Sequence, residues 1–151
     1  MISRVELSKS AYEAGASDRT IEKDYVIGSL LFGIADSLLK KLLAFKGGTS
    51  IKKIYFPDYR YSEDLDFTLL EEVNADTLIH QFKISLPVIE KATALTLNLP
   101  DERIERRIDS LTCYVEFVGP LLAKLGSRDI KIDFTFNEII VFPLKIGYPL
   151  F

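Results

Sequence analysis

FKGGTS at residues 45–50, followed by RYSEDLDF at residues 60–67, carries the strongest signals of fold and site in this sequence. The first stretch places two adjacent glycines before two hydroxyl side chains, an arrangement typical of a turn that can cradle a phosphate. The second places Asp64 and Asp66 on an expected strand, where side chains two positions apart point the same way. Two carboxylates on one face can hold Mg²⁺. Together the two stretches predict a site for a metal-bound nucleoside triphosphate.

The composition is that of an ordinary globular protein, and the length suggests a single domain. The 151 residues are 48% hydrophobic and 27% charged, which is enough to bury a core. We expect a helical part at about residues 1–43 and an α/β core at about residues 44–151. No apolar run approaches the roughly 20 residues of a membrane span, and residues 1–10 are too polar for a secretory signal. The sequence therefore predicts a cytoplasmic protein without membrane association.

Cysteine content and charge exclude further kinds of site. Cys113 is the single cysteine, so the sequence excludes an internal disulfide and a cysteine-ligated zinc site. The net charge of −3 provides no overall attraction to nucleic acid. Such a contact would need a local basic patch, and Arg103, Arg106 and Arg107 form the one obvious arginine cluster. A solvated face is the simpler interpretation of that cluster.

Hydrophobic spacing and turn residues predict the order of the elements in the first two thirds of the chain. Apolar residues at helical spacing predict a helix over about residues 17–43. A second helix, from residue 74 to about residue 86, should be disturbed at Pro87. Between them we expect a strand at residues 42–46, a short helix at residues 50–55 stopped by Pro57, and a strand at residues 65–70.

The last third alternates between apolar and polar residues, which is the pattern of half-buried strands. We expect strands at residues 102–108, 111–118 and 129–137. Helices that cover such a mixed sheet give an α+β (α/β layered) architecture.

A third carboxylate extends the candidate metal site. By the same alternation, Asp133 lies on the polar face of its strand, as Asp64, Asp66 and Thr68 do on theirs. If the two strands are neighbours, the three aspartates converge and their like charges raise one another's pKa. A divalent cation, Mg²⁺ or Mn²⁺, removes that conflict. Two such ions could activate an attacking hydroxyl and neutralise a leaving pyrophosphate.

The glycine turn supplies the phosphate-binding half of the site. Its backbone amides, with the N-terminus of a helix behind them, suit an anion. Arg60 and one of Lys46, Lys52 or Lys53 could balance the charge of a triphosphate. The candidate phosphate-binding residues are Lys46, Gly47, Gly48, Thr49, Ser50, Lys53, Arg60 and Ser62. The pattern is not a P-loop, because no Gly-x-x-x-x-Gly-Lys-Ser/Thr motif is present.

Simpler interpretations of these residues stay open. Asp64 and Asp66 could lie on a solvated strand face, and alternation alone explains Asp133. The two glycines could form an ordinary tight turn, with Thr49 and Ser50 as helix caps. The tyrosines at positions 55, 59 and 61 could stack on a base or pack the loop around them.

An ordered set of motifs makes the sequence resemble a known family. The motifs are Glu22-Lys23-Asp24-Tyr25, then Phe45-Lys46-Gly47-Gly48-Thr49-Ser50, then Lys53 and Tyr55, then Arg60-x-Ser62-Glu63-Asp64-x-Asp66. In this order they resemble the AbiEii/AbiGii-type nucleotidyltransferases, which are toxins of abortive-infection toxin–antitoxin systems in the DNA polymerase β-like nucleotidyltransferase superfamily. The resemblance implies a mixed β-sheet flanked by helices. It also implies that Asp64 and Asp66 are the metal-binding pair and Asp133 the third catalytic carboxylate.

The resemblance further implies an activity and partners. The activity is metal-dependent transfer of NMP from an NTP to an acceptor, tRNA or protein, and a cognate antitoxin is the expected partner. Family members continue into a helical C-terminal part that carries a lysine and further acidic residues, and we expect that part to be absent here. The apolar ending at residues 148–151 would then favour self-association. The alternatives are a catalytically inactive truncated remnant that only binds Mg-NTP or a partner protein, and a purely structural domain.

Overall fold

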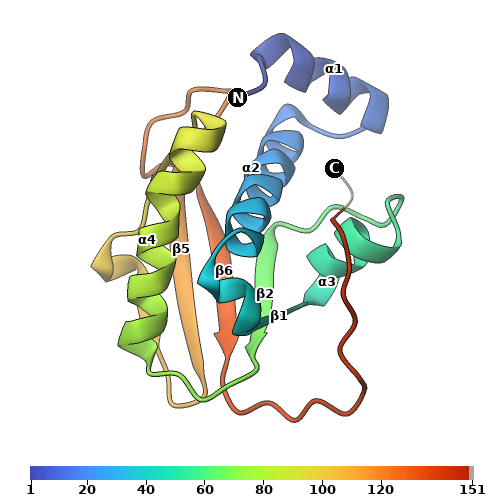
Figure 1. The fold of residues 1–151 in the computed structure, drawn as a ribbon. Helices are drawn as coiled ribbons and strands as arrows, with labels where there is room; N and C mark the ends of the chain where they lie inside the picture. The colour runs from blue at the N-terminus through green and yellow to red at the C-terminus, as the bar shows by residue number, and fades with distance from the viewer. Residues whose placement is uncertain (150–151) are drawn as a thin grey trace.

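The described residues, 1–149 of the computed structural model, form a six-stranded mixed sheet in the order β1-β2-β6-β5-β3, with β4 paired to β5 (Figure 1). The strands are β1 Leu43–Lys46, β2 Asp64–Leu69, β3 Thr96–Asn98, β4 Ile104–Arg106, β5 Ser110–Val118 and β6 Asp129–Thr135. β2 and β6 are parallel, and the other neighbours are antiparallel. The expected mixed sheet with flanking helices is confirmed. Leu150 and Phe151, which end the apolar segment expected to favour self-association, lie outside the described residues.

Helices α2 and α4 pack together over one face of the sheet, and α1 packs on α2 (Figure 1). The helices are α1 Arg4–Ala14, α2 Asp18–Ala35, α3 Gly47–Ser50 and α4 Ala75–Thr93, with the short helices η1 Leu38–Lys41, η2 Ile51–Tyr55 and η3 Asp101–Arg103. Helix α1, which the sequence analysis did not predict, begins at a capping box formed by Ser3 and Glu6. None of the helices described in residues 1–149 is both long and apolar enough to cross a membrane.

The single helix expected over residues 17–43 is wrong in its last part. Helix α2 ends at Ala35, and the chain passes through the extended residue Ser37 into η1. The Ser37 hydroxyl donates to the carbonyl oxygen of Ile34 at 2.8 Å and accepts from the amide of Leu39 at 3.2 Å. A serine that bonds to the backbone on both sides competes with continued helix. Apolar spacing alone therefore extends the predicted helix too far.

Helix α4 runs through Pro87 to Thr93, so the end expected near residue 86 is wrong. The buried residues Phe82, Leu86 and Ile89 lie on one face of the helix, before and after the proline. Their burial against the sheet and α2 stabilises the helix by more than the roughly 3 kcal/mol that an internal proline costs. Tertiary packing thus overrides the local breaking signal.

The expected strand at residues 102–108 is also too long. Helix η3 takes its first residues, and β4 covers only Ile104–Arg106. The amide of Arg107 donates to the carbonyl oxygen of Ser110 at 2.9 Å, which closes a tight turn into β5. The strands expected at residues 111–118 and 129–137 correspond to β5 and β6, although β6 ends at Thr135. Strand β3 was not predicted.

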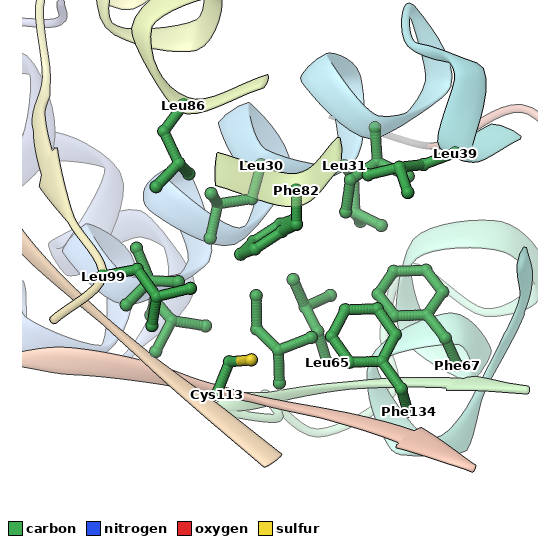
Figure 2. Close-up of a cluster of buried hydrophobic side chains, with 14 of the residues drawn as sticks. Leu30, Leu31, Leu39, Leu65, Phe67, Phe82, Leu86, Leu99, Cys113 and Phe134 are labelled. Carbon is green, nitrogen blue, oxygen red and sulfur yellow. The ribbon is translucent and has the colours of Figure 1, made fainter. Parts of the chain in front are cut away.

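The main hydrophobic core lies between the sheet and the helices α2 and α4 (Figure 2). Leu65 and Phe67 of β2 are 0% and 2% exposed. The ring of Phe67 stacks on that of Phe134 at 5.7 Å, and Phe82 of α4 meets Phe134 edge-on at 6.0 Å. The inward half of the predicted β2 alternation is confirmed, so Asp64 and Asp66, which alternate with these residues, face away from the core.

Candidate functional site

The aspartates of β2 and β6 lie on the sheet face opposite the main core. The two strands are parallel neighbours, in a register that places Asp66 beside Asp133 and Asp64 beside Lys131. Because the apolar residues between them point into the core, these four side chains point to the other face. The structure therefore brings the three predicted carboxylates to one face of the sheet.

Burial and like charges act together on Asp66. Burial raises the pKa of Asp66 above the ordinary carboxylate value, and the carboxylates of Asp133 and Asp64 raise it further. The ammonium groups of Lys46 and Lys131 act in the opposite direction. Asp66 therefore carries an electrostatic conflict that a bound cation would relieve.

Asp133 is held by two neighbouring side chains. The hydroxyl of Thr112 donates to Oδ1 of Asp133 at 2.5 Å, and Nζ of Lys131 lies 3.0 Å from Oδ2. The hydrogen bond to Asp133 in turn raises the pKa of Lys131. Neither Thr112 nor Lys131 was predicted as a site residue. Strand alternation could have identified Lys131, since it stands two positions before Asp133, whereas Thr112 arrives through the β5–β6 pairing.

The carboxylates offer a partial metal site. Across residues 1–149, no group of three or more His, Cys, Asp or Glu side chains is arranged so that it could hold a metal ion. Asp64 and Asp66 alone supply hard oxygen donors on one strand face. Mg²⁺ is typically held by one or two carboxylates together with substrate phosphates. These two residues fit Mg²⁺ or Mn²⁺, and Asp133 could join them after releasing Lys131.

We expect Asp66→Asn to stabilise the protein in metal-free buffer at pH 7, by about 0.5–1 kcal/mol in the free energy of unfolding. Folding raises the pKa of Asp66. Protonation of Asp66 therefore stabilises the folded state fully below the ordinary pKa of 3.8, and this contribution is lost as the pH rises through the pKa of the folded state. Asparagine stays neutral and avoids that loss. Urea unfolding at pH 3 and pH 7 measures the difference, with the exposed Asp58→Asn as control. An Asp66→Asn variant less stable than the wild type at pH 7 would contradict this electrostatic account.

The glycine turn lies directly against the Asp66 carboxylate. Gly47 has φ of +79°, and a Cβ at this position would lie 2.4 Å from Oδ2 of Asp66. A Cβ at Gly48 would lie 3.2 Å from the hydroxyl oxygen of Ser62. Both glycines thus allow the chain to approach residues of the second motif, and the positive φ of Gly47 agrees with the predicted turn.

The helix after the turn begins earlier than expected. It starts at Gly47 as α3 and continues as the π-helical η2 to Tyr55, so Thr49 and Ser50 lie inside it and do not cap it. Both hydroxyls bond to the backbone: Thr49 to the carbonyl oxygen of Asp64 at 2.5 Å, and Ser50 to that of Gly47 at 2.8 Å. The Thr49 hydroxyl ties the turn to the start of β2, and the Ser50 hydroxyl closes the turn onto itself.

We expect Gly47→Ala to be about 1–3 kcal/mol more destabilising than Gly15→Ala. Both glycines have positive φ, but a Cβ at Gly15 meets nothing within 4 Å, whereas one at Gly47 must displace Asp66. The matched pair therefore separates backbone strain from the contact with the carboxylate. Urea unfolding measures both variants. Equal losses of stability would show that the close approach of Gly47 to Asp66 has no energetic weight.

The predicted lysines lie in different surroundings. Nζ of Lys46 lies 3.0 Å from the hydroxyl oxygen of Thr135 and 2.6 Å from Oε2 of Glu138. The Lys53 side chain is 5% exposed, and its Nζ lies 2.6 Å from Oδ2 of Asp24. Lys46 therefore belongs to the face that carries the aspartates, whereas Lys53 connects η2 to α2.

Arg60 lies beside the glycine turn. One of its guanidinium nitrogens would lie 3.8 Å from a Cβ at Gly48. Nζ of Lys52 lies 4.0 Å from the centre of the Tyr61 ring, and Tyr61 packs against the small cluster formed by α1 and the start of α2. The packing interpretation therefore holds for Tyr61. Tyr55 and Tyr59 are exposed.

Three consecutive residues of α2 fix the segments around the site. Glu22 is fully buried and accepts hydrogen bonds from the amide of Leu121 at 2.7 Å and from the guanidinium of Arg128. Lys23 pairs with Glu63 at 2.9 Å, immediately before β2. The next residue, Asp24, pairs with Lys53 of η2. This side of α2 therefore contacts the loop before β6, the start of β2 and the helix after the turn.

Comparisons with known proteins place this arrangement in a family. A family model described as "Nucleotidyl transferase AbiEii toxin, Type IV TA system" matches residues 29–148. The crystal structure of JHP933 from Helicobacter pylori aligns with a TM-score of 0.57 and 18% identity, over 80% of this chain and 45% of that chain. A second H. pylori structure, titled provisionally as a nucleotidyltransferase, gives a TM-score of 0.57 and 18% identity, over 81% of this chain and 47% of that chain.

These structural likenesses show the fold alone, and the chain spans a little under half the length of the two structures. No curated protein matches the sequence. The family model, by contrast, covers well over half of the chain, from the second half of α2 through the glycine turn and all the strands. The chain therefore belongs to the AbiEii nucleotidyl transferase toxin family of type IV toxin–antitoxin systems.

Proposed function

We propose that this chain carries the nucleotide site of a metal-dependent nucleotidyltransferase, which transfers NMP from an NTP to an acceptor and releases pyrophosphate. The supporting observation is the meeting of the glycine turn with the carboxylate face, where a Cβ at Gly47 would lie 2.4 Å from Oδ2 of Asp66. A phosphate chain at this turn would lie next to the carboxylates. Family membership supports the same reaction class.

In this proposal Asp64 and Asp66 hold Mg²⁺ or Mn²⁺, and Asp133 is the third carboxylate of the site. When bound, the metal would supply charge neutralisation for the leaving pyrophosphate and activation of the attacking hydroxyl. Thr112 holds one carboxylate oxygen of Asp133, whose strand position pairs with Asp66, and the other oxygen would leave Lys131 when Asp133 joins the metal. Oriented oxygen donors favour a charged transition state because little reorganisation is needed during the reaction.

In this proposal the glycine turn and the residues next to it bind the phosphates. Gly47 and Gly48 are the first residues of α3, and the amides of a first helical turn have no partner within the helix. They could donate to phosphate oxygens, together with the hydroxyl of Ser62 and the guanidinium of Arg60. Thr49 and Ser50 would act indirectly: Thr49 holds the turn against β2, and Ser50 stabilises the turn itself.

Lys46 and Lys53 would contribute in different ways. Lys46 lies on the carboxylate face and could reach a phosphate from there. A direct contact of Lys53 with phosphate would require a change in its buried pairing with Asp24. We therefore propose for Lys53 mainly the support of η2.

The acceptor would be tRNA or a protein, and the partner would be a cognate antitoxin in the cytoplasm. Incubation of the purified chain with each radiolabelled NTP, Mg²⁺ and total tRNA or lysate proteins tests the transfer. We expect label to appear on one acceptor class and to disappear with EDTA. Nucleotide binding without label on any acceptor would overturn the transfer and support the alternative, a module that holds Mg-NTP without turnover.

A further inference from the structure

A second polar cluster lies on the carboxylate face, next to the aspartates. Nζ of Lys46 contacts Oε2 of Glu138 at 2.6 Å and the hydroxyl oxygen of Thr135 at 3.0 Å. The hydroxyl of Thr68 donates to the same Oε2 of Glu138. One carboxylate oxygen thus accepts from an ammonium group and a hydroxyl, as a phosphate oxygen does in many anion sites.

The register of the sheet fixes where this cluster lies relative to the candidate metal ligands. Lys46 of β1 pairs with Asp66, so its side chain emerges on the carboxylate face. Thr68 and Thr135 are paired across β2 and β6, two positions beyond the pair of Asp66 and Asp133. The two threonines therefore stand one side-chain repeat, about 7 Å, along the strands from the aspartates. Lys46 starts beside Asp66, and its ammonium group reaches Thr135.

Thr68 gives the cluster the character of a built site. Thr68 is 3% exposed, and a buried hydroxyl requires a hydrogen-bond partner. The partner that it has is the carboxylate of Glu138, a residue outside the sheet. Glu138 follows Asn137, whose φ of 55° turns the chain at the end of β6. The turn directs the Glu138 carboxylate onto Lys46 and Thr68.

The Glu138 side chain and the residues after it are largely open to solvent. The Glu138 side chain is 41% exposed, and the residues after it, Ile139 and Val141, are 87% and 78% exposed. The hydrogen bonds from Lys46 and Thr68 lower the pKa of Glu138 below its ordinary value. Withdrawal of Glu138 would expose an ammonium group and a hydroxyl without disturbing the core.

We propose that Lys46, Thr68 and Thr135 form an anion pocket for a phosphate group of the nucleotide, and that the Glu138 carboxylate occupies this pocket until the phosphate displaces it. Glu138 is then an internal competitor of the substrate. This inference rests on the proposed function, since it assigns a further subsite and its regulation to the same face. It differs from a purely positioning role, in which Glu138 would orient Lys46 and favour phosphate binding.

The sign of the effect of Glu138→Gln on anion affinity separates these roles. Calorimetric titration of inorganic pyrophosphate in metal-free buffer uses neither Asp64 nor Asp66 as a metal ligand. We expect Glu138→Gln to bind pyrophosphate about tenfold more tightly than the wild type, because removing a competing state raises the fraction of open pockets. Glu105→Gln is the matched control, since it removes an equal charge from an exposed strand residue paired with Arg107. Unchanged or weaker binding by Glu138→Gln, or no binding by any variant, overturns the proposal.

A second variant tests the pocket itself. Thr68→Val in the Glu138→Gln background removes the buried hydroxyl and keeps the shape of the side chain. We expect most of the tenfold gain to be lost, and a gain that persists overturns the pocket. The outcomes are distinguishable from a failure of the proposed function. If the chain shows no nucleotide transfer but Glu138→Gln still binds pyrophosphate more tightly, only the proposed enzyme activity is rejected. If the chain transfers nucleotide but Glu138→Gln leaves pyrophosphate binding unchanged, only the role of Glu138 as a competitor is rejected.

Discussion

Asp64→Asn and Asp66→Asn together are expected to lower the rate of nucleotide transfer at least about a thousandfold, because a bound metal contributes several kcal/mol and each 1.36 kcal/mol is tenfold in rate. Asparagine keeps the shape of each side chain but offers a neutral oxygen to the cation. The two residues flank a buried leucine on β2, so the substitution changes the outward face and leaves the core intact. Relief of charge repulsion should also keep the double variant at least as stable as the wild type.

Initial rates of label transfer, measured beside thermal unfolding, check this expectation. The matched control is Asp58→Asn with Asp36→Asn, which removes the same two charges at exposed positions outside the site. The control should transfer at the wild-type rate. A folded Asp64/Asp66 double variant with activity within tenfold of the wild type would remove the metal assignment.

Glu22→Ala should be the most destabilising of the substitutions considered, at about 3–5 kcal/mol in the free energy of unfolding. Glu22 is fully buried, and its carboxylate is bound by the guanidinium of Arg128 and the amide of Leu121. Its removal leaves a largely buried arginine without that partner and opens a cavity beside Gly119, where a Cβ would lie 2.8 Å from Oε1 of Glu22. An unpaired buried charge costs far more than a surface ion pair contributes.

Urea unfolding of Glu22→Ala, Glu63→Ala, Arg128→Ala and the Glu22→Ala/Arg128→Ala double variant tests the role of Glu22. Glu63→Ala, which breaks the exposed pair with Lys23, should cost less than about 1 kcal/mol. Arg128→Ala should be less damaging in the Glu22→Ala background than in the wild type, because the two residues act on each other. Additive losses, or a Glu22→Ala variant as stable as Glu63→Ala, would show that the buried pair does not fix the loop before β6.

Local patterns predicted the strands that carry the site, but the contacts between strands depend on pairing over long sequence distances. Alternation placed Asp66 and Asp133 on polar faces, and the outward direction of both follows from it. The parallel pairing of β2 with β6 joins residues far apart in the sequence, and no local pattern specifies it. The same holds for Thr112, which reaches Asp133 only because β5 lies on the other side of β6.

The helix boundaries and the ion-pair partners of the lysine side chains were harder to predict from the sequence. Ser37, whose hydroxyl bonds to the backbone of Ile34 and Leu39, follows the end of α2, and burial on both sides of Pro87 continues α4. Each boundary thus depends on a contact that competes with propensity. The charge of Lys53 suggested a phosphate ligand, yet its burial against Asp24 depends on the packing of η2 on α2. Glu138 lies beyond the last strand, where the alternation that identified the other site residues no longer applies.

The most direct test of the account is a calorimetric titration of each NTP with Mg²⁺ into the chain and into the Asp64→Asn/Asp66→Asn variant. We predict binding of at least one NTP by the wild type, loss of that binding with EDTA, and no metal-dependent binding by the variant. Binding that is unchanged in the variant, or no binding of any NTP by the folded wild type, would contradict the assignment of the nucleotide site to the glycine turn and the carboxylate face.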